Sequence, residues 1–577
     1  MKKSFILILA AIVLTATMII LPVAVSAKEE AGDPVAVSDA AGFAAMASGG
    51  TYYLTADITV SETHLTAFSG TFDGKGHKIT TSVTLFDTFE GTAKDFTIEG
   101  SVTSNADRAG AFCNTVVGDT TLSGIINKAS VTGSMSATAK SDDLGVSGVY
   151  GGIIGTTLKS ISVTIESCEN YGKISGYDAG GIAGKTHCKL TVKNCKNFGD
   201  IDSFDVGAGI IGWTWDDYTV EGCVNGSKTV SPKIVNADDC AGGIVAYVSG
   251  NTTGTIKNCV NYGKISIDPN AEKKSAGGIM GRPGAKGTHN YEGCENYGPV
   301  EAWFAGGITG KDQGAVNFLR CMNYADINAT RHGAGIIAEL DNDEVSDPST
   351  ITYCGNYGSI KATKDTAGGI ISYANGSAAR TLTIKGCIND GDVTGGCESS
   401  GILGYMNNTT ASTVNACINT GLITTTDTGE TPVALYFFKS GDATAENNKN
   451  NFYLAGCAQG EARLGSGVVE FNPTSGTAFE YGEVCYKLNQ ALGEEVFFQT
   501  IGTDRIPTFD SSSKKVVFEN GEYKNPAPVN PGGQDPAPGG QTPPTGDGFV
   551  FTAAIALVAL LAAGAVLVYR RRTACGR

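Results

Sequence analysis

Residues 151–174 read GGIIGTTLKSISVTIESCENYGKI, and residues 180–201 repeat the same plan as GGIAGKTHCKLTVKNCKNFGDI. Each segment opens with a Gly-Ile element and closes on Cys-x-Asn-aromatic-Gly-x-Ile. Nine copies of the opening element are present, and they begin at Gly151, Gly180, Ala208, Gly242, Gly277, Gly306, Ala334, Gly368 and Ser400. A cysteine follows each copy, and successive cysteines are 27 to 36 residues apart. A repeat of this length indicates a solenoid.

The segments between the two motifs are short and rich in β-branched residues, as at 190–192 and 382–384, and they lack the 3.6-residue period of helices. Each repeat therefore predicts one coil of about three short strands, stacked on the next at roughly 4.8 Å through parallel hydrogen bonds. The fold class predicted is all-β: a right-handed parallel β-solenoid of about a dozen coils, with a small α+β cap at its C-terminal end. The isoleucines of both motifs should form its interior.

The second motif predicts three columns of identical side chains. Asparagine follows each cysteine by two residues and should occupy a left-handed corner position, where its amide can pair with the asparagines of neighbouring coils. The next residue is usually aromatic, which predicts either mutual stacking or a sugar-binding stripe. Stacked cysteines leave their Cβ atoms farther apart than a disulfide allows, so we expect buried thiols.

Both ends of the solenoid are predicted to be covered. Residues 33–67 form an N-terminal cap, with a helix over 38–48 that has Ser38 as its N-terminal cap residue and turns Phe43 and Met46 inward. The repeats extend over 68–470. Residues 471–523 form a small α+β cap, in which Val484, Leu488 and Leu492 share a face of a helix over 480–492.

The two termini carry the features of an exported, anchored protein. Residues 1–27 have the form of a secretory signal peptide, with an uncleaved N-terminal anchor as the alternative reading. Residues 524–548 are a stalk rich in Pro and Gly, residues 549–569 are apolar enough for a transmembrane helix, and residues 570–577 form a basic cytoplasmic tail.

Within the stalk, Thr542-Pro543-Pro544-Thr545-Gly546 precedes the apolar segment and the arginines. This tail resembles the sortase sorting signal of Gram-positive surface proteins, with Thr542 in place of the usual Leu. The resemblance implies sortase and peptidoglycan as partners, Thr545 as the residue joined to the cell wall, and an extracellular location. An ordinary single-pass membrane anchor is the alternative.

The Gly-Gly-Ile-Ile-Gly and Gly-Gly-Ile-Ala-Gly elements resemble the GLUG repeat of bacterial surface proteins, which also precedes IgA-specific metallopeptidases. The resemblance covers residues 68–448 and implies a surface solenoid with an adhesive role. The chain has no His-Glu-x-x-His motif, and its five histidines are scattered, so peptidase activity is not implied.

A formal net charge of −16 argues against nucleic acid as a partner. We predict no catalytic residue, metal site or cofactor. Trp213, Trp215, Asp216 and Asp217 are predicted to form a protruding aromatic and acidic loop, and they are the candidates for ligand contact. The predicted function is that of a non-enzymatic adhesin or binding protein for host, matrix or glycan ligands.

Two alternatives stay open: a carbohydrate-active β-helix enzyme, either a polysaccharide lyase or a glycoside hydrolase, and a passive structural stalk. The enzyme would need converging carboxylates. Asp178, Asp205, Asp239 and Asp365 share one corner, but Lys274 and His332 interrupt the column, so we expect solvated side chains. The acidic run at 341–344 could supply calcium ligands, but a surface insertion explains it better.

Overall fold

The computed structural model describes residues 33–526 except 134–147, 237, 285, 343–346, 377–380, 408–411, 428, 430–431, 439–447, 459–466, 472–478 and 480. The predicted signal peptide, the sorting motif from Thr542 to Gly546 and the apolar segment 549–569 lie outside the described residues. Within the described part, no helix is long and apolar enough to cross a membrane.

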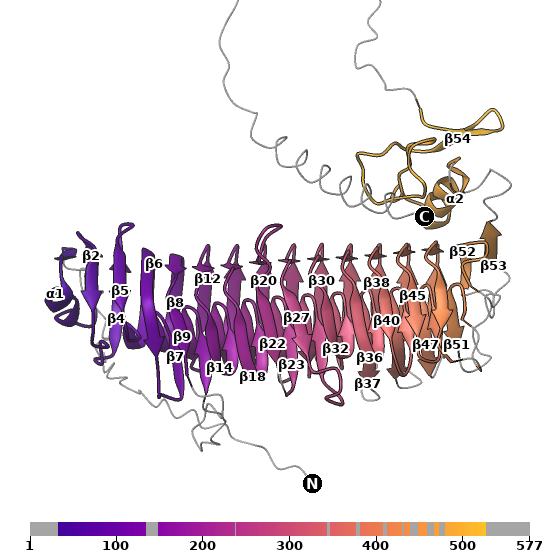
Figure 1. The fold of residues 1–577 in the computed structure, drawn as a ribbon. Coiled ribbons are helices and arrows are strands. Elements are labelled where there is room, and N and C mark those ends of the chain that lie inside the picture. The colour runs from indigo at the N-terminus through magenta and orange to yellow at the C-terminus, as the bar shows by residue number, and fades with distance from the viewer. Residues whose placement is uncertain are drawn as a thin grey trace, which may run out of the picture. The chain divides into compact units, whose positions relative to one another are not determined.

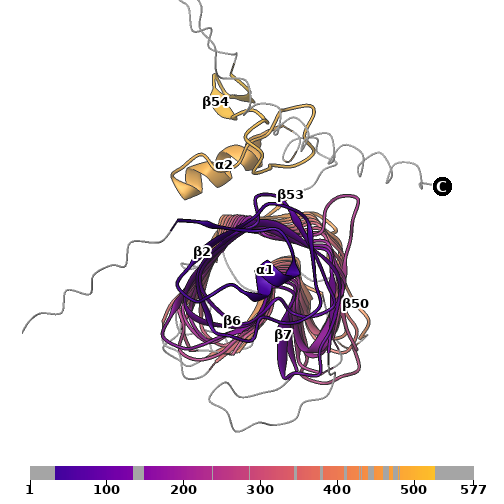
Figure 2. The same cartoon turned by 90° about the vertical axis from the view of Figure 1, so that its left-hand side faces the viewer.

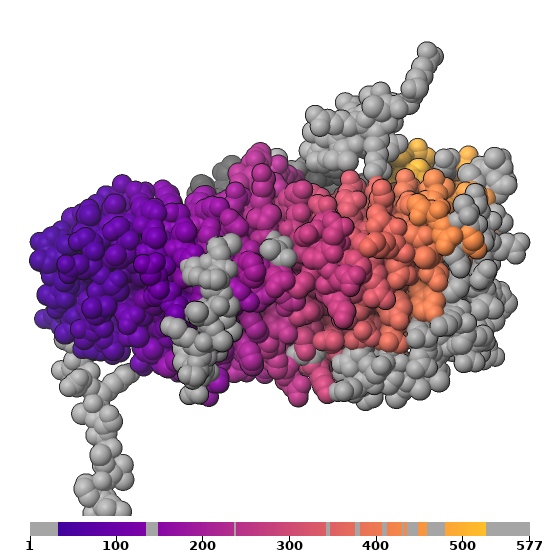
Figure 3. Space-filling model, turned by 60° about the horizontal axis from the view of Figure 1, so that its bottom comes forward, coloured from indigo at the N-terminus to yellow at the C-terminus, as the bar shows by residue number. Residues whose placement is uncertain are grey.

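The described chain forms a parallel β-solenoid, as predicted (Figure 1). All but two of its strands belong to one 53-stranded sheet in which each coil pairs with the next. One in-register column shows the stacking, and its rungs include Phe72, Ala93, Leu122, Ile165, Val192, Val220, Ile256, Tyr291, Phe318, Ile351, Ile384 and Val414. The coils form one continuous surface from the indigo to the orange end (Figure 3).

Besides an additional strand in five coils, namely β9 (Ser130–Thr132), β22 (Lys233–Asn236), β27 (Lys264–Ile267), β40 (Ile360–Ala362) and β45 (Val393–Gly395), each regular coil contains four strand segments. The first are β7 (Arg108–Gly110), β10 (Val149–Gly151), β14 (Ile174–Gly180), β18 (Ile201–Ala208), β23 (Cys240–Gly242), β28 (Ser275–Gly277), β32 (Val300–Gly306), β36 (Ile327–Ala334), β41 (Ala367–Gly368) and β46 (Ser399–Ser400). The second, after the Gly-Ile element, are β11 (Ile154–Thr157), β15 (Ala183–Thr186), β19 (Ile211–Thr214), β24 (Val245–Val248), β29 (Met280–Pro283), β33 (Thr309–Asp312), β37 (Ile337–Asn342), β42 (Ile371–Gly376) and β47 (Leu403–Asn407).

The third and fourth segments complete the coil. The third are β12 (Ser162–Glu166), β16 (Lys189–Lys193), β20 (Tyr218–Glu221), β25 (Gly254–Lys257), β30 (Thr288–Glu292), β34 (Ala315–Leu319), β38 (Ser349–Thr352), β43 (Leu382–Lys385) and β48 (Thr413–Asn415). The fourth hold the asparagines and are β13 (Glu169–Asn170), β17 (Lys196–Asn197), β21 (Val224–Asn225), β26 (Val260–Asn261), β31 (Glu295–Asn296), β35 (Met322–Asn323), β39 (Gly355–Asn356), β44 (Ile388–Asn389) and β49 (Ile418–Asn419).

The two sequence motifs meet inside the coil. A Cβ atom on Gly181 would lie 2.0 Å from the carbonyl oxygen of Gly209 and 2.6 Å from Oδ1 of Asn197. Only glycine therefore allows the Gly-Ile turn to approach the asparagine this closely. The close approach explains why each Gly-Ile element in the array is followed by an asparagine in the same coil.

The asparagines form the predicted ladder. Each Nδ2 donates to Oδ1 of the next asparagine at 2.7 to 2.9 Å, from Asn127 through to Asn419. The prediction of a left-handed backbone at these asparagines is wrong. They lie in strands, and the positive φ angles belong to the residue before each cysteine, such as Asn194 (53°) and Asn258 (52°). An extended backbone is needed because it turns the amide inward, toward the ladder.

The repeated cysteines form the predicted column of buried thiols. None of the cysteines in the described part of the chain is in a disulfide. The Cys195 thiol donates to the carbonyl oxygens of Lys193 at 3.4 Å and Ile165 at 3.6 Å. Burial raises the pKa of the Cys168 and Cys259 thiols well above its usual value, so these groups stay protonated.

The N-terminal opening is covered by helix α1 (Ala40–Ala44), which lies at the centre of the ring in Figure 2. Phe43 and Met46 are buried, as predicted. The predicted cap residue, Ser38, is wrong by one position: Asp39 caps the helix, and its Oδ1 accepts from the backbone N of Gly42 at 2.8 Å. Asp and Ser are equally suited to this role, so the sequence pattern did not distinguish them.

The C-terminal segment contains helix α2 (Glu483–Leu492) and the hairpin of β54 (Val517–Glu519) and β55 (Glu522–Lys524). Helix α2 lies outside the ring, beside the coils (Figure 2). Val484 and Leu488 pack with Ile388 and Ile418, so the segment covers the flank of the coils, whereas the sequence predicted a cap over the last coil. The residue that follows the cysteine faces outward. It is Glu169 or Lys196 in early coils but Ile388 and Ile418 here, which leaves an apolar flank to be covered.

Candidate functional site

The ring bends inward beside β7 in Figure 2. In the repeats this place, between the first and second strands of a coil, is occupied by the Gly-Ile element. We call the outer side of this turn the re-entrant corner, since the outward side chains of the two strands meet there. Two small apolar clusters, separate from the main interior, fill it. One contains Val206, Cys240 and Ala246 with Trp213 and Tyr247, and the other contains Trp303, Phe304 and Ala338.

The predicted ligand residues Trp213 and Trp215 lie at this corner. Trp213 belongs to strand β19, not to a protruding loop: it is half-buried, and its indole Nε1 donates to Ser249 Oγ at 3.0 Å. Trp215 follows the strand and is 44% exposed. Its ring stacks on Trp213 (centroids 5.7 Å apart, 17° between planes) and on His187 (5.7 Å, 28°). Together these three rings form an aromatic platform, in which Trp215 is the exposed ring.

A buried cation supports the platform. Lys185 is 2% exposed, and its Nζ lies 3.8 Å from the centroid of the Trp213 ring and 5.6 Å from that of Trp215. Lys185 and Trp213 are paired in register on the neighbouring strands β15 and β19, and this pairing puts the ammonium over the indole face. A desolvated cation–π contact of this kind is worth about 2 kcal/mol and fixes the orientation of the ring.

The predicted acidic partners have structural roles. Asp217 Oδ1 accepts from the backbone N of Thr253 in the next coil at 2.7 Å. Asp216 Oδ1 accepts from the backbone N of Asp217 at 2.8 Å. Both side chains organise the turn that carries Trp215, so the platform is held by local hydrogen bonds.

The corner carboxyls are less solvated than the sequence predicted: Asp178 is buried, and Asp205 and Asp239 are half-buried. Asp178 is fully buried, and neither of its oxygens has a hydrogen-bond partner among the described residues. Burial raises the pKa of Asp178 to about 8, with Lys185 opposing the shift and Asp205 and Asp239 adding to it. Burial also raises the pKa of Asp205 to about 6 and that of Asp239. The inward turn removes Asp178 from water, and a linear pattern does not reveal such a turn.

Arg282 moderates this acidic cluster. Its guanidinium Nη2 lies 2.8 Å from Oδ2 of Asp239 and packs over the Tyr247 ring at 5.1 Å. The arginine lowers the pKa of Asp239 against the larger effect of burial. The corner therefore combines aromatic rings, the buried Lys185, the half-buried Arg282 and three carboxyls within neighbouring coils.

A second polar cluster lies farther along the same corner and includes the predicted Asp365. His332 Nδ1 lies 2.8 Å from Glu339, and its Nε2 lies 3.4 Å from Asp365. Lys311 Nζ contacts Glu339 at 2.5 Å and Asp341 at 3.1 Å. Burial lowers the pKa of His332, but its bonds to Asp365 and Glu339 outweigh burial and raise it. Burial raises the pKa of Glu339, yet His332 and Lys311 bring it down to about 2.

Glu339 and Lys311 were not predicted as site residues, although the sequence carries a signal for them. The fourth residue after the second glycine of each Gly-Ile element faces the corner. In the eight coils that follow the first, these residues are Lys185, Trp213, Tyr247, Arg282, Lys311, Glu339, Tyr373 and Tyr405. Large aromatic and charged residues at one fixed offset could have indicated a common surface.

Two groups of possible cation ligands, the acidic run at 341–344 and a cluster seen only in the structure, include carboxylates already held by protein groups. The Asp341 carboxylate contacts Lys311 and accepts from Asn375 Nδ2 at 3.1 Å, so it is engaged by protein groups. The rest of the predicted calcium run, residues 343–344, lies outside the described residues. Asp365, Cys397 and Glu398 have ligand atoms within 4.8 Å of one another, but Asp365 is already held by Arg331 at 3.1 Å.

Comparison with protein families and with curated proteins finds no match. Among solved structures, a protein from Bacteroides ovatus described as a "putative immunoglobulin A1 protease" is similar over 46% of this chain and 75% of that chain. The sequence identity is 19% and the TM-score is 0.33. A likeness this weak carries no argument about function.

Proposed function

We propose that the protein is a binding protein of the cell surface, an adhesin, and that the aromatic platform of Trp213, Trp215 and His187 contacts its ligand. The exposed Trp215 ring carries this proposal. It is large, its orientation is fixed by stacking, and it borders charged groups. Rigid aromatic anchors surrounded by polar groups dominate the binding energy of many interfaces.

The chemistry of the corner favours a glycan or a glycosylated matrix protein as the ligand. A sugar ring presents an apolar face that can lie on an indole, and its hydroxyl groups suit nearby carboxyl and lysine groups. The indole of Trp213 is held by Ser249 and Lys185, so little side-chain entropy is lost on binding.

Binding of the full-length protein to a glycan array and to immobilised matrix proteins tests this function. We expect the Trp215→Ala variant to lose tenfold or more in affinity. Tyr481→Ala is the matched control, because Tyr481 is also a half-exposed aromatic residue but lies outside the corner. Absence of binding to every surface, or equal binding by both variants, would refute the proposed site.

Surface attachment is part of the proposal and rests on the C-terminal sequence. Sortase and peptidoglycan are the proposed partners, with Thr545 as the linked residue. Replacing Thr545 and Gly546 by alanine should leave the protein extractable by detergent. If the variant remains bound to the cell wall, the sortase assignment is wrong.

A carbohydrate-active enzyme is the second candidate, and the carboxyls of the corner favour it. With a pKa of about 8, Asp178 keeps its proton at neutral pH, whereas Asp205, at about 6, is mostly ionised. Acid and base catalysis needs two carboxyls in different protonation states. Release of sugar products from a polysaccharide by the wild type, and its loss in Asp205→Asn, would establish the enzyme over the adhesin.

A further inference from the structure

The aromatic residue of the second motif forms a ladder with one rung missing. The rings stack as predicted: Tyr171 lies 4.8 Å from Phe198, and Tyr262 lies 5.0 Å from Tyr297. Tyr324 and Tyr357 continue the stack at spacings of 4.7 and 5.2 Å. Between Phe198 and Tyr262 the corresponding residue is Gly226. Two aromatic faces therefore border a coil that supplies no ring of its own.

The residues after Gly226 make this glycine necessary. Gly226 has φ of +85°, and a Cβ there would lie 2.6 Å from the carbonyl oxygen of Val230. The chain then turns, with the backbone N of Ser227 donating to that carbonyl at 2.7 Å and Ser227 Oγ accepting from the backbone N of Val230 at 3.0 Å. This turn fills the inner part of the space where an aromatic ring is missing, and the outer part of that space stays open.

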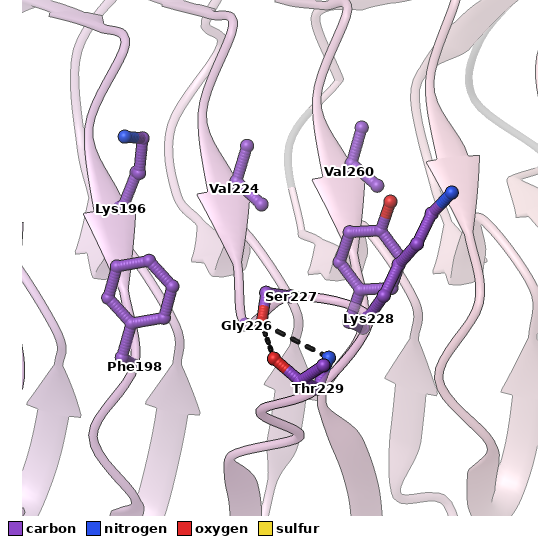
Figure 4. Close-up of a pocket in the computed structure, with 9 residues that line it drawn as sticks. Lys196, Phe198, Val224, Gly226, Ser227, Lys228, Thr229 and Val260 are labelled. Carbon is purple, nitrogen blue, oxygen red and sulfur yellow. Dashed lines mark hydrogen bonds between the residues drawn. The ribbon is translucent and has the colours of Figure 1, made fainter. Parts of the chain in front are cut away.

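A pocket of about 510 Å³ occupies this position, and Phe198 and Tyr262 both line it. Figure 4 shows Phe198 on one side of Gly226 and Lys228 on the other. Val224 and Val260 add an apolar wall. Coils are roughly 4.8 Å apart, so the two rings are separated by roughly 9.6 Å, which is the space for one six-membered ring stacked on both faces.

Two lysines line the same pocket. Lys196 contacts Glu169 at 3.0 Å. Lys228, at the exposed turn, forms no ion pair with any residue in the described part of the chain. In a protein with a net charge of −16, an available ammonium beside two aromatic faces points to an anionic group on the ligand.

We propose that the pocket between Phe198 and Tyr262 binds a six-membered ring that carries a carboxylate. The ring replaces the missing rung, and the carboxylate contacts Lys228. A sugar acid and an aromatic acid share this chemistry. The site is independent of the platform at Trp215, because it is lined by other residues on a different corner of the coils.

Titration of the full-length protein with glucuronate and with benzoate, followed by saturation-transfer NMR, tests the proposal and separates the two ligand sources. At least one acid should bind, and glucose, which has no carboxylate, should bind tenfold or more weakly. Phe198→Ala and Val224→Trp should each reduce affinity at least tenfold, the first by removing a stacking face and the second by filling the pocket. Lys228→Gln should reduce it about fivefold.

Matched controls decide whether the effect is local. Tyr171→Ala removes a ladder ring that does not line the pocket, and Trp215→Ala alters only the platform, so both should bind like the wild type. A circular dichroism melt of each variant verifies folding. The proposal is overturned if neither acid binds, or if Val224→Trp and Lys228→Gln, both folded, bind as the wild type does.

Discussion

The asparagine ladder and the re-entrant corner occur in the same coils but follow opposite rules. In the ladder every coil supplies the same side chain, and each is fully buried and hydrogen-bonded to its neighbour in the ladder. At the corner, the equivalent position changes from Lys185 to Trp213 to Tyr247 in successive coils. Identity is required where side chains must bond to copies of themselves, and variation is allowed where the coil faces outward. The variable corner is therefore the surface on which recognition can develop.

Removing one ladder asparagine should have the largest effect. Asn261 makes four hydrogen bonds: with Asn225, with Asn296, and two with Gly263. Asn261→Ala leaves buried polar groups of both neighbouring coils without partners, which should cost about 4 kcal/mol. The midpoint of urea unfolding measures this. The exposed Asn270→Ala should change stability by less than about 0.5 kcal/mol, and equal effects of the two variants would mean that the ladder is not stabilising.

Replacing a corner carboxyl should have the opposite effect and stabilise the protein. The buried Asp178 carboxyl lacks hydrogen-bond partners among the described residues, so its ionisation destabilises the folded state at high pH. Its pKa is about 8 in the folded state and about 4 when unfolded, so the folded protein binds the extra proton between these values. Stability then falls by about 1.4 kcal/mol for each pH unit from about 4 to 8. Asp178→Asn should flatten this slope and gain about 3 kcal/mol at pH 8.

Urea unfolding at pH 5 and pH 8 measures the change for Asp178→Asn. The exposed Asp95→Asn is the control and should keep the wild-type slope. If Asp178→Asn and the wild type lose stability in parallel as the pH rises, Asp178 is not buried as a neutral acid.

The same contrast explains what could be predicted from the sequence. A residue repeated at one place in every coil must meet its copies, so Asn197, Cys195 and Tyr297 indicated the ladders directly. The burial of Asp178 depends on how far the chain turns inward between two strands. The spacing of the repeated residues along the sequence does not indicate how deep this turn is. The contact of α2 with Ile388 was missed because it joins segments about 100 residues apart, although the change from charged to apolar residues at this position was visible.

His332 should give the smallest effect, because its neighbours can be rehydrated at the corner more easily than in the ladder. The bonds to Glu339 and Asp365 raise the pKa of His332 above that of the unfolded chain. Its contribution to stability is therefore complete below about pH 6.5 and is lost as the pH rises through the folded-state pKa. His332→Gln should cost about 2 kcal/mol at pH 6 and less at pH 9. Replacement of the half-buried His77, whose Nδ1 lies 3.2 Å from the exposed Asp57, should cost less than about 1 kcal/mol at pH 6, because an ion pair at the surface is weak. A cost for His332→Gln that is the same at both pH values would show that packing on Tyr373, not charge, holds the imidazole in place.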